Sequence, residues 1–268
     1  MAAHELGYYV VDAFTDKPFT GNPAAVVPLD RWLPDELMQA IAAEMNLSET
    51  AFFAPEEHGF RLRWFTPVCE VDLCGHATVG TAAVLMGKLE PARREVTFQS
   101  RSGPLGVTRA GDLYVLDFPA RPPVPVDDPA LLAEVAAAVG ERPSALARSR
   151  RDLIAIFDRG EQVRGLRPDF GRIAAIDDRC LMVTAPGDEA GVDFVSRFFV
   201  PRSGVPEDPV TGSAHCALVP YWAARLGKTG LDARQVSRRG GALACELAGD
   251  RVRLGGRAVL VADGTLHL

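Results

Sequence analysis

The sequence predicts an α+β fold made of two similar lobes. Strand-like stretches of alternating polarity intersperse with helical stretches along the chain, and a strand–loop–helix pattern of the first half recurs in the second. At 268 residues the chain is also close to the practical limit of a single hydrophobic core. Both observations favour two lobes over one.

Composition excludes several classes of protein. The formal net charge of −6 argues against a broad nucleic-acid surface, which needs a basic face. No apolar run approaches the ~20 residues of a membrane span, and residues 1–9 lead into a strand instead of forming an export leader. We therefore expect a cytoplasmic protein with neither nucleic-acid nor membrane partners. Its five cysteines are expected to be reduced.

The first half contains the stronger local signals. A helix is expected over residues 34–46, because proline suits its first position and apolar residues repeat at helical spacing. A second helix is expected over residues 75–87, ending at Gly87 as a C-terminal cap. The expected strands of this half are residues 8–14, 24–28, 47–54, 60–64, 95–100, 106–109 and 113–118.

The second half follows a proline-rich stretch. Residues 119–129 contain five prolines without periodicity, which indicates a linker between the lobes. Helices are expected over residues 130–139 and 212–226, and strands over 153–157 and 180–185. The tail from residue 235 is expected to form consecutive hairpins, with turns at residues 240–241, 249–250 and 255–256.

The internal repeat is the most informative feature. Residues 63–67 (Arg-Trp-Phe-Thr-Pro), a loop and the helix start Gly75-His76-Ala77 match residues 197–201 (Arg-Phe-Phe-Val-Pro), a loop and the start Gly212-Ser213-Ala214. A helix start carries unpaired N–H groups and partial positive charge, and glycine lets a ligand approach closely. Two facing starts would clamp an anion such as a carboxylate, whereas the alternative is that each glycine only permits tight helix packing.

Three titratable residues lie at or near these segments. His76 follows Gly75, and Asp208 precedes the second helix; taken alone, either is typically a structural residue. Glu49 lies among apolar residues, and on a strand it shares a face with Ala51 and Phe53. A partly buried carboxylate suits a general acid or base, although an edge-strand glutamate pointing to water fits the same local pattern.

Other chemistries lack their motifs. No Gly-x-Gly-x-x-Gly follows a strand, and neither a P-loop nor a Gly-x-Ser-x-Gly elbow is present. Cys69, Cys74 and His76 have loosely metal-like spacing, but no second ligand cluster completes a zinc site. The sequence therefore gives no support for a dinucleotide site, a P-loop or a metal site.

Several motifs, in order along nearly the whole chain, resemble the PhzF-like family of phenazine-biosynthesis isomerases, which has the diaminopimelate-epimerase-like fold. The motifs are residues 12–15 (Asp-Ala-Phe-Thr), 19–27 (Phe-Thr-Gly-Asn-Pro-Ala-Ala-Val-Val), 46–52 (Asn-Leu-Ser-Glu-Thr-Ala-Phe), 63–67, 71–78 (Val-Asp-Leu-Cys-Gly-His-Ala-Thr) and 207–215 (Glu-Asp-Pro-Val-Thr-Gly-Ser-Ala-His). Any one of them alone would be weak evidence.

The resemblance implies a fold and an assembly. Each lobe would be a barrel-like sheet around a central helix, with residues 1–118 plus 257–268 in one lobe, 119–256 in the other, and the active site in the cleft between them. It also implies a homodimer and no cofactor.

The resemblance also implies roles for particular residues. Glu49 would be the acid/base, assisted by His76 and Asp208. The expected substrate-binding residues are Asn22, Gly75, Ala77, Gly212, Ser213 and Ala214.

The expected reaction is isomerisation of a small anionic substrate, an unsaturated amino- or hydroxy-carboxylic acid. Glu49 would remove a proton from carbon and return it at another carbon. Epimerases and racemases of this fold use two cysteines; Cys74 occupies the first position, but the second loop has none and Cys216 lies inside the helix. The alternatives are a racemase or epimerase that uses Glu49 with Cys74, and an inactive ligand-binding relative.

Overall fold

The computed structural model describes residues 5–57, 59–150, 152–178 and 180–268. The chain divides into two compact units: unit 1 comprises Met1–Asp117 with Gly255–Leu268, and unit 2 comprises Phe118–Leu254. The lobe boundaries expected from the sequence, 118/119 and 256/257, lie one and two residues further along the chain. No helix in the described ranges is long and apolar enough to cross a lipid bilayer.

Unit 1 is a curved mixed sheet. Strand pairing runs β18–β1–β2–β3–β4–β6–β7–β8, and short β5 adds to β4. The pairs β2–β3 and β4–β6 are parallel and the others antiparallel. The strands are β1 (Glu5–Ala13), β2 (Asn22–Pro28), β3 (Glu49–Glu56), β4 (Gly59–Phe65), β5 (Glu70–Val71), β6 (Glu95–Ser100), β7 (Gly103–Ala110), β8 (Leu113–Pro119) and β18 (Ala258–His267).

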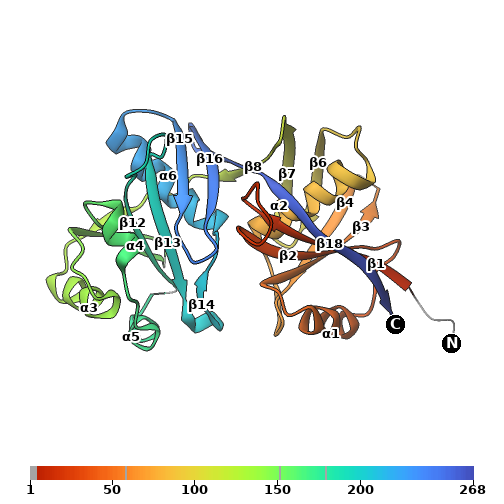
Figure 1. Cartoon of the computed structure of the whole chain (residues 1–268), viewed down its shortest axis with the longest axis horizontal. Helices are drawn as coiled ribbons and strands as arrows, with labels where there is room; N and C mark the ends of the chain where they lie inside the picture. Colours follow the sequence, from red (N-terminus) through yellow and green to blue (C-terminus); the bar gives the residue numbers. More distant parts are fainter. Residues whose placement is uncertain (1–4, 58, 151, 179) are drawn as a thin grey trace. The chain divides into compact units, whose positions relative to one another are not determined.

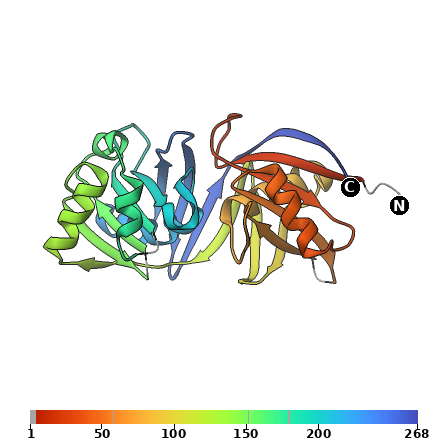
Figure 2. The ribbon, with the colours of Figure 1, turned by 90° about the horizontal axis from the view of Figure 1, so that it is seen from below.

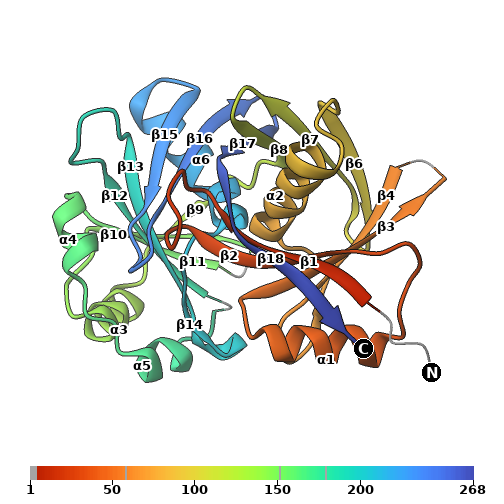
Figure 3. The ribbon, with the colours of Figure 1, turned by 45° about the vertical axis from the view of Figure 1, so that its right-hand side comes forward.

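Helix α2 (Gly75–Val84) is the central helix of unit 1. It packs against β1, β2, β3 and β18, and the sheet curls around it (Figure 3). Its residues are almost all buried because they are small and apolar or are threonines whose hydroxyls bond back to the helix. Gly80 illustrates the fit, since a Cβ there would already touch Val11 and Val26.

Helix α1 (Asp35–Met45) covers the other face of the same sheet (Figure 2). Its Met38 and Ile41 pack with Val27, Phe52 and Phe65. Side chains alternate between the two faces of β3. Phe52 lies on the face that packs against α1, and the opposite face, toward α2, carries Glu49, Ala51 and Phe53. The strand alternation therefore directs Glu49 to the central helix.

Unit 2 repeats the pairing scheme of unit 1. Its order is β9–β10–β11–β12–β13–β15–β16, with β14 added to β13 and with β11–β12 and β13–β15 parallel. Its strands are β9 (Val124–Val126), β10 (Ala145–Ser149), β11 (Asp152–Ile156), β12 (Cys180–Pro186), β13 (Phe194–Val200), β14 (Val205–Asp208), β15 (Gly230–Gln235), β16 (Gly241–Ala248) and β17 (Arg251–Gly256). The parallel and antiparallel steps from β11 to β16 match those from β2 to β7.

Helix α6 (Gly212–Leu226) is the unit 2 counterpart of α2 (Figure 1). It packs on β15 and β16, and Trp222 Nε1 donates a hydrogen bond to Thr184 Oγ1 of β12 at 2.9 Å. The other helices, α3 (Pro129–Val139), α4 (Gly160–Gly165) and α5 (Phe170–Ala175), contribute to a core on the opposite face of β11–β13. Short helical turns are η1 (Leu85–Leu89, π) and η2 (Pro201–Ser203, 3₁₀). The α+β fold of two pseudo-equivalent units is thus confirmed.

Four local expectations were wrong. Residues 124–126 of the expected linker form β9, which pairs with β10. Gly87 does not cap α2, because the helix continues into η1 through Leu89. The pair Gly255-Gly256 is the end of β17 and not a hairpin turn, since the next strand, β18, pairs with β1 in unit 1. Pro34 is the N-cap of α1 rather than its first helical residue.

Candidate active site

The start of α2 brings together one cluster of predicted site residues. Cys74 is the N-cap, with extended backbone angles, and Gly75 and His76 open the helix. Glu49 begins β3 and pairs with Ala24 of β2. These positions come from separate sequence motifs and meet because α2 lies against β2 and β3.

The cluster is centred on His76. Its Nε2 lies 3.1 Å from Glu49 Oε2, and its Nδ1 lies 3.4 Å from Cys74 Sγ. The histidine is 5% exposed, whereas the Glu49 side chain is 18% exposed. Within the described residues, buried Oε2 accepts no well-aligned hydrogen bond despite this short separation. Glu49 is therefore neither a solvated edge residue nor a fully sequestered one.

Asn22 positions the imidazole from the other side. Its amide nitrogen lies 3.0 Å from His76 Nδ1, and the residue has no exposed surface. It follows Gly21, whose φ of +68° and close approach to the Ala13 carbonyl require glycine. Asn22 was expected to bind substrate; in the structure it is buried and contacts His76.

The cluster changes the acid–base properties of its members. Burial raises the pKa of the Cys74 thiol to about 11, helped by the Glu49 charge, although His76 and the Ala77 N–H act in the opposite direction. This outcome differs from the lowered pKa that a thiol beside a helix start can have. Burial alone would lower the pKa of His76, but Cys74 and Glu49 favour the imidazolium and raise it well above the usual value. Because Cys74 stays a thiol near neutral pH, Glu49 supplies most of this charge pairing.

A second group of predicted residues surrounds the start of α6. Asp208 ends β14, Thr211 is the N-cap, and Gly212, Ser213 and Ala214 form the first turn. The Thr211 hydroxyl donates to Asp208 Oδ2, which fixes the carboxylate. Of the first turn, Ser213 is partly exposed while Gly212 and Ala214 are buried. This group belongs to unit 2, and the cluster of Glu49 and His76 belongs to unit 1.

Gln235 holds the Asp208 loop in place, a role that was not predicted from the sequence. Its Oε1 accepts the Thr211 N–H at 2.8 Å, and its Nε2 donates to the Asp208 carbonyl at 2.7 Å. The side chain is 1% exposed. A glutamine at the end of a strand gives no local signal of this role, since its partners lie 24 and 27 residues earlier.

Both helix starts retain features of an anion site. Neither the Cys74 side chain nor the Thr211 side chain caps its helix by a hydrogen bond. The first-turn amides are therefore not all satisfied by the cap residue, as they would be with a capping serine or aspartate. Each start carries the partial positive charge that stabilises carboxylates.

The repeat also places matching ion pairs beside the two helix starts. Arg63 bonds Glu70 through Nε and Nη2 at 2.7 and 2.8 Å, and Arg197 bonds Glu207 through the same atoms at 2.7 and 2.9 Å. Each guanidinium also lies over a phenylalanine two residues later, at 5.1 and 5.0 Å. Each glutamate precedes its helix-opening glycine by five residues. In each unit the arginine thus ties its own strand to the short strand that leads to the helix start.

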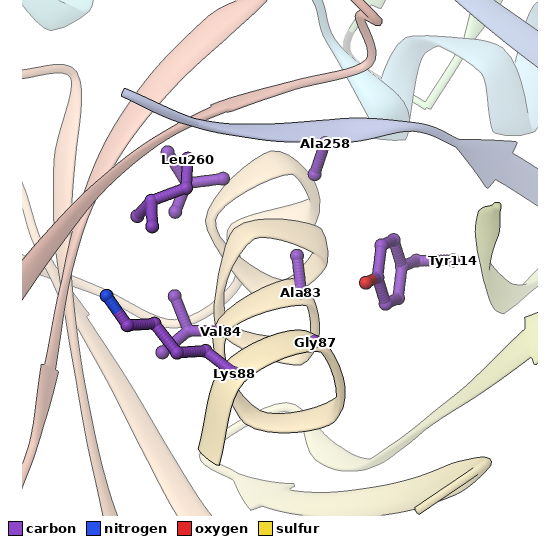
Figure 4. Close-up of a pocket in the computed structure, with 8 residues that line it drawn as sticks. Ala83, Val84, Gly87, Lys88, Tyr114, Ala258 and Leu260 are labelled. Atoms are coloured by element: carbon purple, nitrogen blue, oxygen red, sulfur yellow. The ribbon is translucent and has the colours of Figure 1, made fainter. Parts of the chain in front are cut away.

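The described part of each unit also contains a hollow. One, of about 310 Å³, lies against the far end of α2, where Ala83, Gly87 and Lys88 face Tyr114 and the β18 residue Leu260 (Figure 4). Its helical residues are two turns or more beyond His76, roughly 10 Å along the axis, so it is distinct from the cluster. The other, of about 480 Å³, is partly lined by Gln235 and therefore borders the Asp208 loop.

Comparison with known proteins identifies the class. Residues 11–264 match the model of the family described as phenazine biosynthesis-like protein (PhzC-PhzF). A Pseudomonas aeruginosa protein named as an uncharacterized isomerase is 51% identical, with 98% of this chain and 100% of that protein aligned. The crystal structure of an Enterococcus faecalis PhzF-family protein superposes with a TM-score of 0.95 and 47% identity, covering 99% of this chain and 100% of that one.

The chain belongs to the PhzC-PhzF family, and it is an isomerase. The resemblance drawn from its motifs is confirmed. A hydroxyproline epimerase from Agrobacterium vitis, 10% identical, shares the fold alone, with a TM-score of 0.61 over 98% of this chain and 93% of that one.

Proposed function

We propose that this isomerase shifts a proton and a double bond on a small unsaturated amino- or hydroxy-carboxylic acid, with Glu49 as the base and without a cofactor. The observation that carries the proposal is the pair of Glu49 Oε2 and His76 Nε2, 3.1 Å apart at the open end of α2. A carboxylate with partial exposure can reach a substrate carbon, and a neighbouring imidazolium can stabilise negative charge that develops beside it.

In this mechanism the first-turn amides at Gly75 and Ala77 hold the substrate carboxylate, and those at Gly212 to Ala214 offer a further site for an anionic group. Glu49 takes a proton from one carbon, the electron pair enters the conjugated system, and the proton returns at another carbon. His76 donates a hydrogen bond to the developing charge. Asp208, fixed by Thr211, orients a polar substituent.

The rival racemase mechanism with Glu49 and Cys74 is weakened by distance. Two bases that attack opposite faces of one carbon each need about 3–3.5 Å to it, hence roughly 6–7 Å between them. The Glu49 and Cys74 ligand atoms lie within 4.8 Å of each other, and the thiol pKa of about 11 makes Cys74 a poor base. A single base that removes and returns the proton fits this cluster better.

Proton exchange in deuterated buffer tests the proposal. NMR would follow cyclic and unsaturated amino and hydroxy acids with wild-type protein and with Glu49→Gln, which keeps the shape of the side chain. We expect deuterium uptake with a double-bond shift, slowed about 10²–10⁴-fold by the substitution.

Two results would count against the proposal. Uptake at a stereocentre without a bond shift would favour the epimerase alternative. Exchange that Glu49→Gln leaves unchanged would remove Glu49 from the mechanism. Glu44→Gln, at an exposed residue of helix α1 outside the cluster, is the matched control.

A further inference from the structure

Three chemically different donor groups converge at the start of α2. Ligand atoms of Glu49, Cys74 and His76 all lie within 4.8 Å of one another, which makes them, among the described residues, a group able to hold a metal ion. The set offers one oxygen, one sulfur and one nitrogen. Zinc binds all three donor types, and three protein ligands with an open fourth position are typical of accessible zinc sites.

The separations of the donors come close to those around a tetrahedral ion. With Zn–S of about 2.3 Å and Zn–N and Zn–O of about 2.1 Å, tetrahedral donors lie about 3.5 Å apart for sulfur and nitrogen and about 3.4 Å for nitrogen and oxygen. In the protein, Cys74 Sγ lies 3.9 Å from His76 Nε2, and that nitrogen lies 3.1 Å from Glu49 Oε2. Because Sγ lies nearer Nδ1, at 3.4 Å, than Nε2, an ion on Nε2 requires the Cys74 side chain to rotate toward the Glu49 side of the ring.

The surroundings hold the donors in place. Cys74 and His76 are fixed two residues apart by the first turn of α2, and both are buried. When Nε2 binds a metal, Nδ1 keeps Asn22 as its partner at 3.0 Å, with the amide turned so that its oxygen accepts the Nδ1 proton. The partly exposed Glu49 side chain leaves a path for an ion and a fourth ligand.

We infer that Glu49, Cys74 and His76 form a binding site for one thiophilic divalent cation, Zn²⁺ or Cd²⁺, and that the occupied site cannot transfer protons through Glu49. On binding, the Cys74 S–H bond breaks, a metal–sulfur bond forms, and the proton leaves to the buffer. Any proton on the ring nitrogen that becomes a ligand leaves in the same way. The inference uses residues of the proposed active site, so occupancy would be inhibitory, but metal binding itself does not depend on the proposed reaction.

Metal titration of the full-length, untagged protein tests the inference without a substrate. Zn²⁺ alone is titrated against a chromophoric chelator, and Co²⁺ serves as an optical probe of thiolate ligation. We expect one equivalent to bind, with a thiolate-to-cobalt absorption band. Cys74→Ala should abolish the band and weaken Zn²⁺ binding about 100-fold or more, and Asn22→Ala should weaken it about 10-fold.

Matched variants separate this site from other thiols. Cys69→Ser removes an exposed thiol five residues away and should leave the affinity and the cobalt band unchanged. Glu49→Gln provides a second ligand variant that preserves side-chain shape, and circular dichroism checks that each variant is folded.

Several outcomes would overturn the inference. These are the absence of stoichiometric Zn²⁺ binding, a cobalt band that survives Cys74→Ala, or one that is lost with Cys69→Ser. Proton exchange that continues undiminished with one equivalent of Zn²⁺ bound would overturn the inhibitory part. Zinc binding with the expected variant pattern but no exchange on any compound would instead refute the proposed reaction and leave the metal site standing.

Discussion

Acid should destabilise unit 2 through one buried histidine in α6. The His215 side chain has no exposed surface and lies against Phe194, with ring centroids 5.8 Å apart. Its Nδ1–H donates to the Thr211 carbonyl at 2.8 Å, whereas Nε2 is buried without a hydrogen-bond partner among the described residues. Burial therefore favours the neutral ring and lowers the pKa of His215 to about 4.

The sign and size of the effect follow from proton linkage. Between the unfolded pKa of 6.5 and the folded pKa of about 4, the unfolded chain binds a proton that the folded protein does not. The stabilisation is complete above pH 6.5 and is lost as the pH falls through the folded pKa. A shift of about 2.5 pKa units at about 1.4 kcal/mol each gives a loss on the order of 3 kcal/mol.

Denaturant unfolding at several pH values would measure this loss. Trp222 is the one tryptophan in residues 118–254 and packs in the same helix, so its fluorescence in a Trp32→Phe, Trp64→Phe background reports on unit 2. The comparison variant is His215→Leu, which has similar volume and no titratable group. Carboxylates that titrate in the same range cancel in the difference between the two proteins.

We expect the free energy of unfolding of the wild-type background, relative to the leucine variant, to fall by about 3 kcal/mol from about pH 7 to about pH 4. A difference in the free energy of unfolding that is the same at every pH does not affect this comparison. Parallel pH profiles would refute the reasoning, because they would mean that the buried ring takes up its proton without cost.

Three other substitutions test features described above. Gln235→Leu should lower the free energy of unfolding by about 1–3 kcal/mol, since it strands buried groups of the Asp208 loop, and should slow exchange while the fold persists; urea unfolding and NMR exchange measure the two effects. Gly21→Ala should destabilise unit 1 by more than 1 kcal/mol, because its Cβ would lie 2.2 Å from the Ala13 carbonyl oxygen, and thermal melts would detect this. Arg63→Met should lower the free energy of unfolding by about 1–3 kcal/mol, because the mostly buried Glu70 carboxylate loses two hydrogen bonds while it keeps its ion pair with Arg101; unchanged urea midpoints would contradict this role of Arg63.

Much of the fold was predictable because its signals are local. The helix starts at Gly75 and Gly212 and the strand alternation around Glu49 depend on neighbouring residues, and the structure has all three. Residues 124–126 were missed because prolines dominate the segment, although an edge strand tolerates proline. The fate of Gly255-Gly256 depends on which unit the last strand joins, which is a long-range choice that no turn dipeptide encodes.

The candidate site was predictable to a similar extent. Family motifs pointed to Glu49 and His76, and the structure places them in contact. The contributions of Asn22 to His76 and of Gln235 to the Asp208 loop depend on pairings across 54 and about 24 residues. Cys74 is two residues from His76 in the sequence, but only the fold reveals that its sulfur faces the imidazole.

The pairing of β18 with β1 has a consequence for how the chain is made. Strand β1 lies between β2 and β18, with Glu5 opposite His267 (Figure 3). It therefore gains its second neighbouring strand only after β18 has been synthesised. Unit 2 is continuous in sequence, so all of its strands emerge from the ribosome before residues 258–267 do. Unit 1, although synthesised first, keeps one edge of β1 open until residues 258–267 emerge. Unit 1 is thus the first unit to be synthesised and the last to be completed. Its open β1 edge is where a chaperone would have the longest time to act.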